Sequence, residues 1–151
     1  MRLNYLDSIG YCKALWQDTG TIVTGRLVYF GAGRYCLQQG VDLSLNGDTY
    51  TAFRTDNIFI NITTVCEFTK MYARNDTPVF NNDIIQDDLG NTYYVYWDQI
   101  KSAYLYLPLT EISPTEIQLD IGKTTVVGNV ILDELSEEIL YGKINWKWEF
   151  N

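Results

Sequence analysis

Hydrophobic and polar residues alternate with a period of two along much of the chain, which is the pattern of half-buried β-strands. The clearest case is Val79–Trp97. A short apolar run, Ile84-Ile85, enters this stretch, and the side chains of Tyr93 to Trp97 would point alternately to the two faces of a strand. Between the two runs lies a polar cluster that contains Gly90, and glycine adopts the positive φ of tight turns without a Cβ clash. We therefore predict a β-hairpin here.

The same alternation, bounded by turn residues, recurs in both directions. Asn46-Gly47 is the strongest two-residue hairpin signal, and Gly31-Ala32-Gly33 and Asp98–Lys101 also indicate turns. Gly128 interrupts an apolar run and marks a β-bulge or a close backbone contact. The expected strands are residues 22–24, 27–30, 34–37, 41–45, 49–53, 102–107, 116–121 and 124–132.

Two segments depart from this pattern. Residues 1–13 have weak helical spacing, and we expect an arm or a short helix there. Asp133–Tyr141 is the best helix candidate, because Asp133 or Ser136 can cap its start and Gly142 can end it. The fold class is therefore mainly β, between all-β and a β-rich α+β fold, built from antiparallel hairpins with one short helix near the C-terminus.

The last residues carry a strongly aromatic face. Residues 143–151 alternate, so that Ile144, Trp146, Trp148 and Phe150 would lie on one side of a strand. Such a face either covers the chain's own core or meets another subunit. Our hypothesis for an interface therefore consists of five aromatic residues: Trp146, Trp148, Phe150, Tyr104 and Tyr106.

Composition narrows the possible functions. The chain has 151 residues with 46% hydrophobic and 15% aromatic content, enough for a packed core, and a net charge of −8. The acidity disfavours direct binding of nucleic acid, which needs a basic face. The absence of histidine removes the commonest general base and metal ligand. We expect no cofactor, no signal peptide and no membrane span, and three buried, reduced thiols at Cys12, Cys36 and Cys66, as in a cytoplasmic protein.

Four aspartates flank the predicted central hairpin: Asp83, Asp87, Asp88 and Asp98. Their functional interpretation is a carboxylate pair or a metal site for hydrolysis. Their structural interpretation is capping of turns, which we prefer because aspartate and asparagine are standard turn formers.

The strongest of three distinctive stretches is TVCEFTKMYARNDTPVFNNDII at residues 64–85. It resembles the pattern T-V-x-Q-[FY]-T-G-L-x-D-K-N-G-x-x-I-[FY]-x-G-D-I-[IV] of the YopX family of phage and prophage proteins. The matching residues are Val65, Phe68, Thr69, Asn75, Phe80, Asp83 and Ile84. KALWQDTGTIVTGRL at residues 13–27 is similar to the family's opening, and VVGNV at residues 126–130 is similar to V-I-G-N-I. Lys70 and Asn82 stand where the family usually has glycine, and the tail beyond about residue 141 is extra.

The resemblance implies a small SH3-type β-barrel in the C-terminal half, assembly into oligomers and a phage or prophage source, but no biochemical activity. The expected organisation is an N-terminal hairpin subdomain (1–66), a barrel (67–141) and an aromatic strand extension (142–151). Our main hypothesis is a non-enzymatic protein of the bacterial cytoplasm that acts through contacts with itself or with a host or phage protein. The alternatives are an acidic decoy for a basic nucleic-acid-binding host protein and, less favoured, a metal-dependent hydrolase using Asp83, Asp87 and Asp88.

Overall fold

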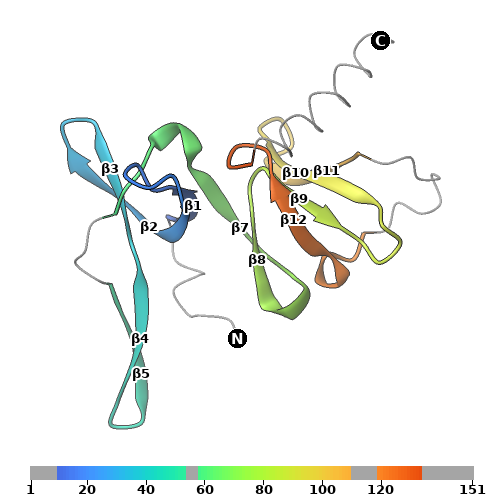
Figure 1. Cartoon of the computed structure of the whole chain (residues 1–151). Coiled ribbons are helices and arrows are strands. Elements are labelled where there is room, and N and C mark those ends of the chain that lie inside the picture. Colours follow the sequence, from blue (N-terminus) through green and yellow to red (C-terminus); the bar gives the residue numbers. More distant parts are fainter. Residues whose placement is uncertain (1–9, 54–57, 110–118, 134–151) are drawn as a thin grey trace. The chain divides into compact units, whose positions relative to one another are not determined.

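The computed structural model describes residues 10–53, 58–109 and 119–133, and within these ranges the chain is mainly β, as predicted (Figure 1). The helical segments of this part of the chain are single 3-10 turns, namely η2 (Ile62–Thr64), η3 (Arg74–Asp76) and η5 (Ile121–Lys123). The strands are β1 (Tyr11–Leu15), β2 (Ile22–Gly31), β3 (Arg34–Gln38), β4 (Gly40–Leu45), β5 (Asp48–Phe53), β6 (Ile58–Phe59), β7 (Cys66–Ala73), β8 (Thr77–Phe80), β9 (Asp83–Gln86), β10 (Thr92–Asp98), β11 (Ala103–Pro108) and β12 (Thr125–Asn129).

The chain divides into two compact units, residues 1–70 and 71–151. In the first unit, five antiparallel strands lie in the order β6-β3-β2-β1-β7. Strand β1 corrects our expectation of an arm or short helix over residues 1–13 in its described part, because the backbone of β1 pairs with β2 on one side and with β7 on the other. The rest of that expectation, over residues 1–9, lies outside the described residues. One face of this sheet forms a core of fully or nearly fully buried side chains: Cys12, Ala14, Leu37 and Ile60.

Strand β2 runs without interruption through Gly25, where two separate apolar runs suggested two strands. A Cβ atom at Gly25 would lie 2.7 Å from the carbonyl oxygen of Gln38 on β3. Only glycine therefore allows β2 and β3 to approach this closely.

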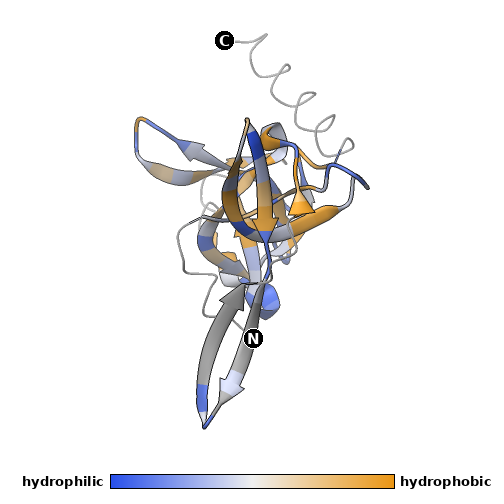
Figure 2. Cartoon of the chain, turned by 90° about the vertical axis from the view of Figure 1, so that its left-hand side faces the viewer, coloured by the Kyte–Doolittle hydropathy of each residue, from blue (hydrophilic) through white to orange (hydrophobic). Residues whose placement is uncertain are grey.

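The predicted hairpin turns of the first unit are confirmed. Gly31, Ala32 and Gly33 all have positive φ and join β2 to β3. Asn46 and Gly47 also have positive φ, at 54° and 83°, as a type I′ turn requires. They join β4 to β5 in a separate two-stranded ribbon, whose tip is hydrophilic (Figure 2).

In the second unit, four antiparallel strands lie in the order β11-β10-β9-β12. The predicted central hairpin is confirmed as β9 and β10, and the register of β12 against β9 shifts beside Gly128, as the predicted bulge requires. Strands β11 and β12 stand at the two edges, so the described residues of this unit form an open sheet and not a closed barrel. Strand β7 continues into this unit, and β8 pairs with it.

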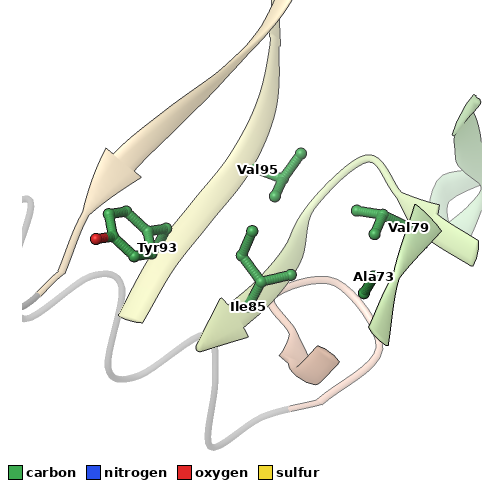
Figure 3. Close-up of a cluster of buried hydrophobic side chains, with 5 residues drawn as sticks. All are labelled: Ala73, Val79, Ile85, Tyr93 and Val95. Atoms are coloured by element: carbon green, nitrogen blue, oxygen red, sulfur yellow. The ribbon is translucent and has the colours of Figure 1, made fainter. Parts of the chain in front are cut away.

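The core of the second unit is built from one face of this sheet together with β7 and β8. Ala73, Val79, Ile85, Tyr93 and Val95 are each at most 3% exposed and point toward a common interior (Figure 3). The opposite face carries a second cluster, formed by Ile84, Leu109 and Val130. Tyr93 and Val95 therefore lie on one face of the sheet and Tyr94 lies on the other, as the sequence predicts.

Several other expectations are wrong or lie outside the described residues. The predicted strand over residues 116–121 is wrong in its described part, because Ile121 begins η5. The predicted helix over residues 133–141 lies outside the described residues from residue 134 on, and the tail over residues 142–151 lies outside them altogether.

Candidate interaction surfaces

Asp83 is the buried centre of a polar network and not part of an open site. Its side chain is fully buried, and its two oxygens accept hydrogen bonds of 2.8 Å from the Phe80 amide and from Asn129 Nδ2. Asn129 Oδ1 in turn accepts from the amides of Ile131 and Leu132. Asp83 therefore ties the turn before β9 to the chain that follows β12.

The other three aspartates stabilise turns or a loop. Asp87 accepts from the amides of Leu89 and Asn91, and the Tyr93 hydroxyl donates to its second oxygen. Partial burial opposes ionisation of Asp87, but these bonds together outweigh it and lower the pKa of the carboxyl group.

Asp98 accepts from the amides of Ile100 and Lys101. Asp88 pairs with Arg74, whose guanidinium also donates to the Lys123 carbonyl oxygen at 2.8 Å. The structure therefore gives each of these aspartates a role in the backbone or in an ion pair, and no group of three possible metal ligands converges among the described residues.

The three cysteines are buried and free, as the sequence predicts. Burial, together with the nearby Cys66 and Glu67, raises the pKa of Cys12 to about 12. The Cys12 thiol is therefore protonated near neutral pH and is a poor nucleophile.

Cys12 lines a pocket of about 300 Å³ between the start of β1 and β7. Tyr11 and Phe68, in edge-to-face contact at 5.7 Å, are buried in its wall, and Glu67 and Lys70 are its exposed charged residues. The pocket is at the lower end of the size range of small-molecule sites.

Two of the predicted interface residues lie in the described part of the chain. Tyr104 and Tyr106 are half-buried on β11 and pack against the core of the second unit. The sequence alone did not distinguish this position from an exposed one. The Tyr106 hydroxyl donates to Met71 Sδ at 3.0 Å, and burial raises its pKa. The other three residues, Trp146, Trp148 and Phe150, lie outside the described residues.

The β10–β11 hairpin of the second unit presents an exposed tryptophan that contacts a half-buried tyrosine. Trp97 is 43% exposed, and its ring meets Tyr104 edge-to-face at 4.9 Å. Ile100 stands in the adjoining turn and is 97% exposed. Because Tyr104 is anchored against the core, it holds the Trp97 ring in a fixed place at the surface.

A second aromatic surface lies in the first unit and was missed in the sequence. Tyr29 and Phe30, at the end of β2, are 61% and 51% exposed. Phe30 meets Phe59 of β6 edge-to-face at 5.2 Å, and the Arg34 guanidinium lies 4.0 Å from the centroid of the Phe59 ring. A run of aromatic residues before a glycine-rich turn, with an arginine after it, was the available signal.

Comparison of the chain with protein-family models, with curated proteins and with solved structures gives no match. Among the described residues there is no helix with the length and apolar character needed to cross a membrane.

Proposed function

We propose that this chain is a non-enzymatic phage or prophage protein that acts in the bacterial cytoplasm through protein–protein contacts, assembling with copies of itself. The observation that carries the contact role is the exposure of ordered aromatic side chains at hairpin ends, above all Trp97 held by Tyr104. Tryptophan and tyrosine contribute most to the affinity of protein interfaces, because they offer large contact areas at a low entropic cost.

The phage origin rests on the YopX resemblance, which the backbone supports at the positions where the sequence departs from it. The family usually has glycine at the two positions that are occupied here by Lys70 and Asn82. These residues have φ of 65° and 73°. This left-handed region of backbone conformation is unfavourable for residues that carry a Cβ, and glycine therefore usually occupies such positions. The backbone thus keeps two conformations that glycines would provide.

The proposal is tested by light scattering of the full chain over a range of concentrations. We expect a mass above that of one chain. The Trp97→Arg variant should reduce the mass, because it puts a charge in the centre of the contact. Leu89→Arg is the matched control, since Leu89 is 78% exposed but lies in the turn between β9 and β10, away from Trp97. A full chain that is monomeric at every concentration would contradict self-assembly.

Deletion of residues 142–151 tests the aromatic tail separately. If the tail is an interface, its removal should lower the oligomer mass or expose apolar surface to a dye. An unchanged mass together with an unchanged melting temperature would show that the tail has neither role.

Salt dependence separates this proposal from the acidic decoy. A decoy that relies on the net charge of −8 should lose its partner steeply between low and moderate salt, whereas an aromatic contact should not. Pull-down from the host, followed by mass spectrometry, would supply the candidate partners for this comparison.

A further inference from the structure

The aromatic surface of the first unit contains a cation that lies close to two aromatic rings. The Arg34 guanidinium carbon lies 4.0 Å from the ring centroid of Phe59 and 5.5 Å from that of Phe30. These are cation–π distances. We call Arg34, Phe30 and Phe59 the arginine–aromatic cluster.

The cluster is organised before any partner arrives. Phe30 and Phe59 hold each other edge-to-face at 5.2 Å, and the Arg34 guanidinium lies within cation–π distance of both rings. Little side-chain entropy therefore remains to be lost on binding.

The N–H groups of the Arg34 guanidinium have no hydrogen-bond acceptor within the described part of the chain. Arg34 is exposed, and no hydrogen bond or ion pair joins it to another described residue. Arg74, the exposed arginine of the second unit, differs in this respect, because it pairs with Asp88 and donates to the Lys123 carbonyl oxygen. A guanidinium that lies against an aromatic ring still has N–H donors to offer a planar anion such as a carboxylate.

We propose that the arginine–aromatic cluster binds an acidic segment of a different protein, with Arg34 pairing with a carboxylate and Phe30 covering an adjacent apolar side chain. This inference deepens the proposed contact function and rests on it. The charge of the cluster favours an acidic partner over a basic one. It also favours a protein over a nucleic acid, because one arginine on a chain of net charge −8 cannot neutralise a run of phosphates.

The test selects binding sequences from a displayed library of random linear peptides, using the purified full chain as bait. We expect enriched peptides to carry Asp or Glu beside an apolar or aromatic residue. For one such peptide, the affinity measured by fluorescence polarisation should fall at least tenfold in Arg34→Gln. It should fall less in Arg34→Lys, which keeps the positive charge but loses the two parallel N–H donors of the guanidinium. Phe30→Ala should also weaken binding, and Arg74→Gln, the control, should not.

A double-mutant cycle assigns the contact. Replacing the peptide's Glu by Gln should cost about as much as Arg34→Gln, and the two changes together should cost no more than either alone. The inference is overturned if the enriched peptides lack acidic residues, if Arg34→Gln binds as the wild type does, or if single-stranded DNA displaces the peptide by binding at Arg34. Self-association that Arg34→Gln abolishes, without any acidic consensus, would also overturn it, because the occupant would then be a second copy.

The two proposals fail in different ways. If no acidic peptide depends on Arg34 but the full chain still forms an oligomer that Trp97→Arg dissociates, this inference falls and the proposed function stands. If the chain is monomeric and binds no peptide, both fall.

Discussion

Replacing Asp83 by Asn would test whether this carboxylate holds the second unit together. Asp83 is fully buried, and its two oxygens accept from two donors, the Phe80 amide and Asn129 Nδ2, each at 2.8 Å. An asparagine has nearly the same shape but only one acceptor oxygen. Its NH₂ group would therefore meet one of the two donors, and one buried donor would lose its partner.

The magnitude follows from these contacts. Losing a hydrogen bond to a charged group costs about 1.5–3 kcal/mol, and an unsatisfied buried donor costs a further 1–3 kcal/mol or so. The neutral amide is cheaper to bury than the carboxylate, which offsets part of the loss. We therefore expect Asp83→Asn to lower the free energy of unfolding by about 2–4 kcal/mol, measured by urea titration of the full chain. Asp88→Asn, which removes an exposed ion pair, should cost about 1 kcal/mol or less.

A second substitution makes the test specific. In the Asp83→Asn background, Asn129→Asp returns an acceptor opposite the new NH₂ group, while the side-chain oxygen of the introduced asparagine can still accept from Phe80. The new carboxylate can also accept from the amides of Ile131 and Leu132, as Asn129 does at 2.9 and 3.1 Å. The long 3.4 Å bond from Asn129 Nδ2 to the Asn81 carbonyl oxygen is not restored.

The double variant should therefore be more stable than Asp83→Asn, although Asn129→Asp alone should destabilise by placing two carboxylates together. The reasoning is refuted if Asp83→Asn costs no more than Asp88→Asn, or if the two substitutions simply add.

Three further predictions concern the Cys12 thiol, the Asp87 turn and the β2–β3 contact. Because the Cys12 pKa is raised from 9.0 to about 12, the stability that the thiol contributes is complete below pH 9 and is lost as the pH rises toward 12. Cys12→Ala should therefore make the free energy of unfolding, measured by urea titration, less dependent on pH over that range. An unchanged pH dependence would contradict this. Because the Asp87 pKa is lowered, its contribution is present above pH 3.8 and is lost as the pH falls below it; the stability difference between wild type and Asp87→Ala should shrink in acid, and a constant difference would argue against the hydrogen bonds as its cause. Gly25→Ala should cost about 2–3 kcal/mol because its Cβ would press on the β3 backbone. Gly122→Ala is the control, since its Cβ would meet nothing closer than 3.5 Å, and equal thermal shifts would refute the steric argument.

The elements that could be predicted from the sequence are those whose structure is decided by near neighbours. Asn46-Gly47 and Gly90 supply positive φ where a turn needs it, and each turn directs its flanking strands to pair. The side chains of β10 alternate between the two faces because the pleat itself has a period of two. Asp87 and Asp98 could be recognised as turn caps for the same reason, since each bonds to amides a few residues away.

Strand β1 could not be predicted, because it depends on distant partners. Its sequence, Tyr11 to Leu15, has no clear alternation, since Cys12 and Ala14 on one face and Tyr11 on the other are all buried. Its position is set by pairing with β2 and, far along the chain, by the register of Cys12 opposite Glu67. A central strand of this kind is stabilised by its neighbours and not by its own pattern.

The candidate interaction surfaces also combine features set by the local sequence with features set by distant contacts. The sequence by itself determined an acidic, histidine-free chain of antiparallel hairpins, because composition and turn chemistry are local properties. Only the tertiary structure decided that Tyr104 would pack inward and support an exposed Trp97, and that Phe59 would lie under Arg34. Which face of a strand is buried depends on how much apolar area the whole fold removes from water, and that sum extends over residues far apart in the chain.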